Sequence, residues 1–278
     1  MSDEKRHNSN DEQLAEQLRR DEEILYEETN KQNEEIEAEV KQTQPLVSKK
    51  EPVETLVELY NAKESAEYFQ KAKELSLTYE SLRRTRHDGN CFYRSVLFAQ
   101  LESILKDVDE RTRFTNVCKG WRSRLLKLGF PEFTTNDFCD WFDELLDSIN
   151  QGKVNEETLF ATLNDDGASN YYVIFFRLIT SGYLREHSVE FEGFVEGGRT
   201  VEQFCREEIE PMWKDCDHLA VTSLTSAIEV SIRIEYMNRS AAPEGGYHHD
   251  FIFHERPPRL YFLYRPGHYD ILYIRDKS

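Results

Sequence analysis

Residues 88–108 read DGNCFYRSVLFAQLESILKDV, and this stretch carries the clearest structural signal in the chain. From Cys91 onward the residues are apolar on most sides of a helical projection, which predicts a helix that is buried all round. Asp88-Gly89 is a typical turn dipeptide, and Asn90 belongs to the residue types preferred at helix N-caps. Cys91 is therefore predicted in the first turn of a buried helix.

The first turn of a helix suits a reactive thiol. The helix dipole favours an anion there, so it should lower the pKa of Cys91, and free backbone N–H groups could stabilise an oxyanion. The alternative is a small buried thiol without a chemical role. We interpret Cys118, Cys139, Cys205 and Cys216 in that second way, because they lie within or between helical patterns.

Helical patterns dominate the chain on both sides of this stretch. The other expected helices lie at residues 53–61, 64–83, 111–129, 134–152, 155–165, 168–187, 200–209 and 217–228. Gly129 and Gly152 should each end a helix, and Thr135 or Asn136 should cap the start of the helix that Gly152 ends.

The pattern changes to strands towards the C-terminus. Residues 229–237, EVSIRIEYM, alternate between apolar and polar, while 259–264 and 268–274 are rich in aromatic and aliphatic residues. Residues 239–250 contain Gly and Pro and are predicted as a loop. Helices first and strands last predict an α+β fold, in which helices cover a small, mostly antiparallel sheet.

The charge of the chain limits its partners. The 278 residues hold 53 acidic and 35 basic side chains, a formal net charge of −18. Nucleic acid and anionic membranes are disfavoured as partners, because both bind clustered Lys and Arg. The charge is compatible with simple solubility or with attraction to a basic protein.

Nothing in the sequence predicts export or membrane insertion. No stretch approaches the ~18 apolar residues of a membrane span, and residues 1–10 lack the apolar core of a secretory signal. Five cysteines without a CxxC pair fit a reducing compartment. The cytoplasm is therefore the expected location, with the nucleus as a second one.

The N-terminal residues differ in composition from the rest. Residues 1–50 contain one aromatic residue, Tyr26, so they bury too little apolar surface to fold alone. We interpret 1–43 as an acidic arm with a helix at about 20–43, which either frays in solvent or orders on a partner. Residues 44–52 are predicted as a linker because they hold two prolines, and 53–278 as one folded domain.

A nucleophilic thiol needs a base, and His268 is the best placed of the eight histidines. It opens the predicted strand 268–274, and Asp270 follows on the same face of that strand. Asp270 could fix the tautomer of His268 and leave the second ring nitrogen for the thiol. The alternative is a surface pair at a strand end. His248 and His249 could suggest a metal, but no further ligand stands at zinc spacing, so no metal and no cofactor are expected.

Longer stretches of the sequence support a family assignment. They are RRTRHDGNCFYRS at 83–95, FRLITSGYLRE at 176–186, FVEGGRTVEQFC at 194–205, EIEPMWKDCDHL at 208–219, RIEYMNR at 233–239 and LYRPGHYDILY at 263–273. Together, and in this order, they resemble the otubain family, a branch of the ovarian-tumour (OTU) superfamily of cysteine proteases that cleave ubiquitin. The resemblance covers nearly the whole of residues 44–278.

The resemblance implies an OTU-type cysteine protease fold, with residues 53–278 as its catalytic domain, and a role for each candidate residue. Cys91 would be the nucleophile, His268 the general base and acid, Asp270 the residue that orients His268, and Asp88 part of the loop that forms the oxyanion hole. The implied reaction is hydrolysis of isopeptide bonds in polyubiquitin, with a preference for 48-linked chains, by a monomeric enzyme.

The resemblance also implies ubiquitin contacts and an alternative function. The N-terminal helix would meet the proximal ubiquitin through Ile24, Leu25, Ile36 and Val40. The distal ubiquitin would contact a second set: Glu196, Gly197, Gly198, Arg199, Ile209, Met212, Trp213, His248 and His249. The alternative is a non-catalytic inhibitor that binds ubiquitin-charged conjugating (E2) enzymes and blocks ubiquitin transfer. An acyltransferase that uses the same Cys and His is a third reading.

Overall fold

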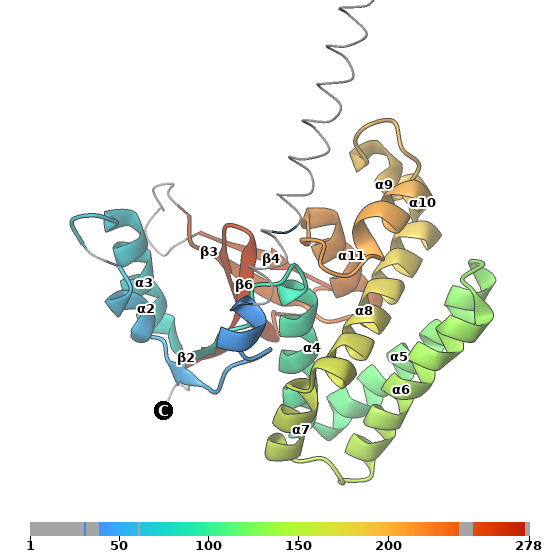
Figure 1. Ribbon diagram of the computed structural model, residues 1–278, viewed down its shortest axis with the longest axis horizontal. Helices are drawn as coiled ribbons and strands as arrows, with labels where there is room; N and C mark the ends of the chain where they lie inside the picture. The colour runs from blue at the N-terminus through green and yellow to red at the C-terminus, as the bar shows by residue number, and fades with distance from the viewer. Residues whose placement is uncertain (1–30, 32–38, 61, 239–246, 276–278) are drawn as a thin grey trace, which may run out of the picture. The chain divides into compact units, whose positions relative to one another are not determined.

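The computed structural model describes residues 31, 39–60, 62–238 and 247–275. The chain divides into two compact units, Met1–Gln44 and Pro45–Ser278. In the first unit residues 39–43 are helical, and Val40 is half-buried. Most of the predicted helix 20–43, with Ile24, Leu25 and Ile36, lies outside the described residues. Figure 1 labels most of the helices and strands of the second unit.

Helices form most of the second unit, as the sequence predicts. They are α2 (Thr55–Glu58), α3 (Ala66–Thr78), α4 (Cys91–Ile104), α5 (Val108–Lys127), α6 (Glu132–Asn150), α7 (Glu156–Leu163), α8 (Asp166–Glu186), α9 (Ser188–Phe191), α10 (Val201–Phe204) and α11 (His218–Ile228). Gly129 and Gly152 follow α5 and α6 with φ of +83° and +67°, so both predicted helix ends are confirmed.

Helix α4 forms the centre of the larger hydrophobic core. Every residue of α4 except Ser103 is buried, which confirms the prediction made from its apolar sequence. It contacts α8 on one side and the sheet on the other. The residue that begins it, Cys91, is therefore held by packing along the whole length of the helix.

The sheet has six strands in the order β1-β2-β6-β5-β3-β4 within the described residues. These are β1 (Glu51–Pro52), β2 (Tyr79–Arg83), β3 (Ile232–Tyr236), β4 (His248–Phe251), β5 (Leu260–Arg265) and β6 (His268–Ile274). Neighbours run antiparallel except β3 and β5, which are parallel. The predicted α+β fold with a mostly antiparallel sheet is therefore confirmed.

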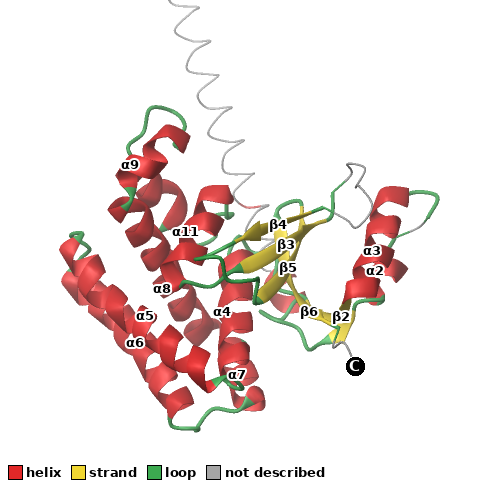
Figure 2. Cartoon of the chain, turned by 180° about the vertical axis from the view of Figure 1, so that it is seen from behind, coloured by secondary structure: helices red, strands yellow, loops and turns green. Residues whose placement is uncertain are grey.

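Each face of the sheet buries its own hydrophobic cluster. Phe262 and Ile271 face the large cluster around α4, while their neighbours Leu263 and Leu272 face a smaller one with α2 and α3. This is the alternation that strand geometry dictates. Figure 2 shows the strands between the α2–α3 pair and the larger group of helices.

Two predictions of backbone structure at the N-terminal side are wrong. The helix predicted at 64–83 ends at Thr78, and Tyr79–Arg83 forms β2, because Tyr79 and Leu82 pack into the smaller cluster and the strand pairs with β6. The linker predicted at 44–52 belongs to the folded unit from Pro45 onward. Val47 in it is fully buried, and Glu51–Pro52 pair with β2.

Smaller differences concern element boundaries. Helix α6 begins at Glu132, directly after Pro131, so neither Thr135 nor Asn136 caps it; Thr135 is instead buried inside the helix. Residues 248–250 were predicted within a loop but form, together with Phe251, the edge strand β4, which pairs with β3. Pairing with β3, which a local pattern does not contain, explains the strand, whereas the extra first residues of α6 are exposed and gain no packing.

No described helix has the length and apolar character needed to cross a membrane.

Candidate active site

Cys91 is the first residue of α4, as predicted, and follows a tight turn. Gly89 in that turn has a φ of +67°, and a Cβ there would lie 2.4 Å from the carbonyl oxygen of Trp213, so only glycine fits. Asn90 occupies the N-cap position, but its side chain makes no capping hydrogen bond. Its Oδ1 instead accepts the backbone N–H of Trp213 at 3.1 Å and two N–H groups of Arg177.

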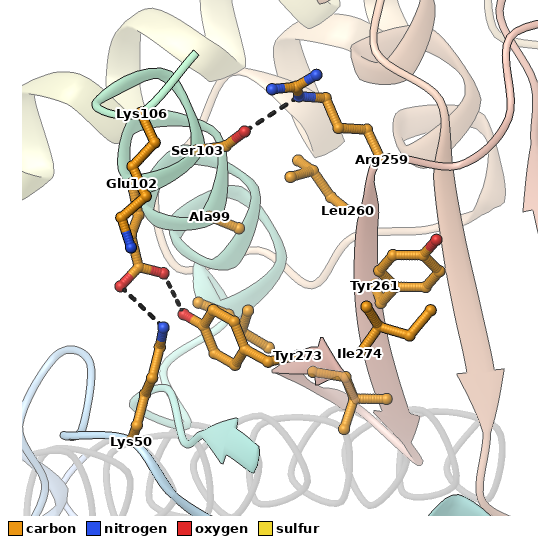
Figure 3. A pocket seen from close by; sticks show the side chains of 12 residues that line it. Lys50, Ala99, Glu102, Ser103, Lys106, Arg259, Leu260, Tyr261, Tyr273 and Ile274 are labelled. Carbon is orange, nitrogen blue, oxygen red and sulfur yellow. Dashed lines mark hydrogen bonds and ion pairs between the residues drawn. The ribbon is translucent and has the colours of Figure 1, made fainter. Parts of the chain in front are cut away.

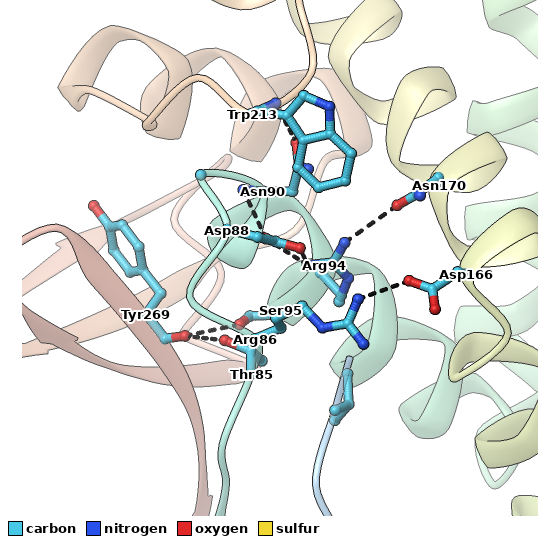
Figure 4. Close-up of polar contacts among 12 residues, drawn as sticks. Thr85, Arg86, Asp88, Asn90, Arg94, Ser95, Asp166, Asn170, Trp213 and Tyr269 are labelled. Atoms are coloured by element: carbon cyan, nitrogen blue, oxygen red, sulfur yellow. Dashed lines mark hydrogen bonds and ion pairs between the residues drawn. The ribbon is translucent and has the colours of Figure 1, made fainter. Parts of the chain in front are cut away.

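Asp88 holds the turn before Cys91 in a fixed shape. Its Oδ1 accepts the backbone N–H of Asn90 at 3.0 Å. Its two oxygens receive Nη1 of Arg94, which is buried in α4, at 2.7 and 2.8 Å. Figure 4 shows both sets of contacts. The carboxylate thus links the backbone of the turn to helix α4. It thereby fixes the orientation of the turn and of its backbone N–H groups.

His268 and Asp270 lie at the start of β6 and share a face, as the sequence predicts. His268 Nε2 is 3.0 Å from Asp270 Oδ1. Asp270 is fully buried and also accepts Arg265 Nη2 at 2.6 Å and the backbone N–H of Thr85 at 3.0 Å. Burial alone would raise the pKa of Asp270, but the hydrogen bond and charge of His268, with Arg265 and Thr85, lower it below its ordinary value.

The second nitrogen of His268 is kept available. Because Asp270 accepts from Nε2, the neutral ring carries its proton there and leaves the lone pair on Nδ1. Nδ1 is buried and has no hydrogen-bond partner among the described residues. His87 stacks on the ring, with centroids 4.6 Å apart and planes 7° apart, so the plane of the imidazole is fixed from one side.

The thiol of Cys91 is not ionised by its surroundings. Burial, the largest cause, and the charges of Asp88 and Asp215 together raise its pKa to about 12, although a hydrogen bond with the backbone of Tyr269 lowers it. The expected lowering by the helix dipole is therefore outweighed by desolvation. Tyr269 lies between His268 and Asp270, so Cys91 sits against the strand that carries them. No hydrogen bond joins the thiol to His268 in the described chain.

The predicted ubiquitin-contact residues fall into separate groups. Glu196, Gly197, Gly198 and Arg199 form a turn before α10, and Arg199 pairs with Glu207 and Glu208. In the next segment Ile209 is buried, Met212 is half-buried and Trp213 is exposed. Of the two groups, the second contacts the turn before Cys91 (residues 88–90), through the hydrogen bond from the backbone N–H of Trp213 to Asn90.

The two histidines of the loop prediction lie elsewhere. His248 and His249 are exposed on the edge strand β4, and β3 and β5 separate β4 from β6. The structure does not bring them to Cys91. The described residues contain no group of three or more His, Cys, Asp or Glu side chains that could hold a metal ion.

Several residues that complete the site were not singled out from the sequence. Thr85 and Arg265 fix Asp270, Arg94 fixes Asp88, and Arg177 fixes Asn90. Arg177 had a visible signal, because it stands alone in the apolar run 172–180 of a helix, where an arginine must be satisfied by partners.

Comparison with known proteins assigns this chain to a family. The family model Peptidase C65 Otubain matches residues 39–274. A ubiquitin thioesterase otubain-like protein of Caenorhabditis elegans is 44% identical over 280 residues, covering 100% of this chain and 98% of that protein. Ubiquitin thioesterase OTUB1 of Homo sapiens is 44% identical over 243 residues, which is 87% of this chain and 88% of that protein.

Solved structures match the fold closely. A chain from the complex h/ceOTUB1–ubiquitin aldehyde–UBC13~Ub superposes with a TM-score of 0.87 at 45% identity, covering 90% of this chain and 98% of that one. A chain from h/ceOTUB1–ubiquitin aldehyde–UBCH5B~Ub gives the same TM-score and identity, covering 91% and 100%.

Proposed function

The chain belongs to the otubain family of cysteine peptidases, and from this premise we propose that it is a deubiquitinase that hydrolyses isopeptide bonds through Cys91, His268 and Asp270. The observation that carries the proposal is the buried His268–Asp270 pair beside a thiol at a helix N-terminus. We further propose the preference for 48-linked polyubiquitin that the family resemblance implies. The relatives named ubiquitin thioesterases support the substrate class.

In the proposed first step His268 acts as general base. Its Nδ1 takes the proton of Cys91, and the sulfur attacks the carbonyl carbon of the C-terminal glycine of ubiquitin. Because the pKa of the thiol is raised to about 12, removal of its proton during attack matters more than a pre-formed thiolate. Asp270 stays ionised and stabilises the imidazolium that forms.

Two groups complete the reaction. Backbone N–H groups of the turn that Asp88 holds, together with that of Cys91, stabilise the oxyanion of the tetrahedral intermediate. When the intermediate collapses, the C–N bond breaks and His268 gives its proton to the leaving lysine amine. Water then attacks the thioester with His268 again as base, which releases ubiquitin as a carboxylate and restores the thiol.

A panel of di-ubiquitin linkages tests the proposal. The wild-type protein should cleave the 48-linked dimer faster than every other linkage, and Cys91→Ala should cleave none. Cleavage of all linkages at one rate would refute the linkage preference alone. Absence of cleavage of any linkage by the wild-type protein would refute the hydrolase.

A second function, inhibition of ubiquitin-charged E2 enzymes, is favoured by a surface away from the site. Phe133 on α6 is 86% exposed and Trp141 on the same helix 45% exposed. The rings of Phe138 and Trp141 each lie 5.2 Å from that of Tyr171 on α8, which makes an aromatic patch. Exposed aromatic clusters are typical of protein interfaces. The matching solved structures contain ubiquitin-charged UBC13 and UBCH5B.

One substitution pair separates the two functions. Cys91→Ala should end cleavage but leave inhibition of an E2 transfer assay unchanged. Trp141→Ala should weaken E2 binding about tenfold or more, as loss of an aromatic anchor does, and leave di-ubiquitin cleavage unchanged. Leu77→Ala, which truncates a side chain that is 79% exposed on α3, is the matched control. Equal effects of both truncations on E2 binding would exclude the patch.

A further inference from the structure

Arg177 on α8 joins two segments that are far apart in the sequence. Its side chain is fully buried, and its guanidinium donates to the carbonyl oxygens of Gly89 at 3.0 Å, Ile209 at 3.0 Å and Lys214 at 2.7 Å. Nε and Nη2 also reach Oδ1 of Asn90, at 3.2 and 2.8 Å, so the N–H groups of Nη2 are shared among three acceptors. The guanidinium group of one arginine thus binds both the turn before Cys91 (residues 88–90) and the segment 209–214.

Asn90 and Gly89 strengthen the same connection. The Oδ1 atom that Arg177 holds also accepts the backbone N–H of Trp213. Trp213 has a φ of +68°, a conformation that a bulky residue adopts only when its surroundings impose it. The backbone of Trp213 packs so closely on Gly89 that no Cβ fits between them. Segment 209–214 and the turn before Cys91 are therefore one packed body around Arg177.

No carboxylate pairs with Arg177 among the described residues, so its charge is balanced by dipoles. The carbonyl oxygens and the ring of Tyr93, 4.4 Å from the guanidinium, surround it. Burial lowers its pKa from the ordinary value. A buried cation without an ion-pair partner is costly, so a core that needed only stability would be better served by an apolar residue. Only an arginine can donate in several directions from one plane.

We propose that Arg177 is a positioning residue that fixes the oxyanion-binding turn relative to the ubiquitin-contact segment 209–214. A ubiquitin tail that lies against this segment then meets the N–H groups of the turn already in place. This inference rests on the proposed deubiquitinase function and deepens it. It assigns the buried arginine to the oxyanion step rather than to activation of the thiol, because its contacts reach the turn and not His268.

Arg177→Lys tests the inference, since it keeps the charge but removes the fork. Ubiquitin aldehyde reports on the oxyanion step: the Cys91 S–H adds across its C=O bond, the sulfur bonds to carbon, and the proton passes to the oxygen that occupies the oxyanion hole. We expect the aldehyde to bind about 10–100-fold more weakly to Arg177→Lys, and kcat for a ubiquitin-linked fluorophore to fall similarly. Affinity for unmodified ubiquitin, KM and the rate of Cys91 alkylation by iodoacetamide should stay within about twofold.

Arg83→Lys is the matched control, because Arg83 is also largely buried but contacts Glu102, Ser48 and Tyr273 instead. It should leave kcat and aldehyde affinity unchanged. If Arg177→Lys does not fold, Asn90→Ala removes the acceptor shared by Arg177 and Trp213 and should show the same selective loss. Equal loss of ubiquitin and aldehyde affinity, or no loss of either, in the folded variant would overturn the inference. Failure of the wild-type protein to bind or cleave would instead refute the proposed function.

Discussion

Helix α4 and strand β6 both run from the candidate active site to the opposite side of the unit. The hydrogen bonding of Glu102 at their far end differs from that of His268 at their near end. At the far end both oxygens of Glu102 are used, by Arg83 at 2.9 Å and by the hydroxyl of Tyr273 at 2.6 Å, and Lys50 adds an ion pair at 3.5 Å. Figure 3 shows Glu102, Tyr273 and Lys50 beside a pocket. At the near end Nδ1 of His268 has no hydrogen-bond partner within the part of the chain that the structure describes.

Within this pair of elements, the paired groups around Glu102 contribute to stability, whereas the unpaired nitrogen of His268 is suited to proton transfer. A buried polar atom without a partner costs free energy, so natural proteins keep few of them. At the far end both oxygens of Glu102 are paired, although Oε1 of Gln100, two residues earlier on α4, has no hydrogen-bond partner among the described residues. At the near end Asp270 binds Nε2 of His268 and His87 stacks on its ring, so the ring is fixed with Nδ1 as an unpaired acceptor. The free acceptor of His268 lies beside the strand residue that contacts Cys91, so the near end is where we expect a proton to be received.

The largest expected effect comes from removing that acceptor. His268→Ala should reduce kcat/KM for di-ubiquitin by about 10²–10⁴-fold, the usual contribution of a general base. The fold should survive, because Asp270 keeps its bonds from Arg265 and Thr85. His254→Ala, an exposed histidine away from β6, is the control. Cleavage by His268→Ala at near the wild-type rate would show that the free nitrogen has no catalytic role.

Local sequence patterns predict this near end well because its signals are local. The turn before Cys91, the start of a buried helix, and the shared face of His268 and Asp270 all follow from neighbours within a few residues. The pKa of the thiol does not, because the burial that raises it comes from the folded core. The contacts of Arg177 are not predictable from local patterns for the same reason, because Arg177 and Asn90 are 87 positions apart in the sequence.

The far end is less predictable from the sequence. Tyr79–Arg83 has a helical pattern on its N-terminal side and becomes a strand only because β6 offers an edge to pair with. Glu102 carries no sign in the sequence that Tyr273 lies beside it, since 171 positions separate them. Local periodicity determines the helices, whereas pairing partners decide where strands begin.

A second test concerns the protonation of the thiol. Since the pKa of Cys91 is about 12, its thiolate fraction should rise tenfold for each pH unit from 7 to 9, and so should alkylation by iodoacetamide. The pKa lies above that of an unfolded thiol, near 8.5, so the stability that this group contributes is complete below about pH 8.5 and is lost as pH rises towards 12. Labelling measured by mass spectrometry at Cys91, with Cys91→Ser as the control, checks this; a plateau below pH 8 would contradict it.

A third test removes the paired group at the far end. Glu102→Ala leaves Arg83 and Tyr273 without their buried acceptor, so the free energy of unfolding should fall by about 3 kcal/mol. Because α4 is packed along its whole length, kcat should change by less than about twofold. Urea unfolding and di-ubiquitin kinetics measure the two quantities. A loss of kcat that matches the loss of stability would show that the two ends are not independent.

The smallest expected effect concerns the field around the near end. Asp88, Asp215 and Asp270 act on Cys91 with the same sign, and the whole chain carries a net charge of −18. Such a field should attract the basic C-terminal tail of ubiquitin, so kcat/KM should fall about three- to tenfold from ~50 to ~500 mM KCl while kcat stays constant. The far end should respond little to salt, because the Arg83–Glu102 pair is largely shielded from solvent. A flat salt profile of kcat/KM would leave the charge with a role in solubility alone.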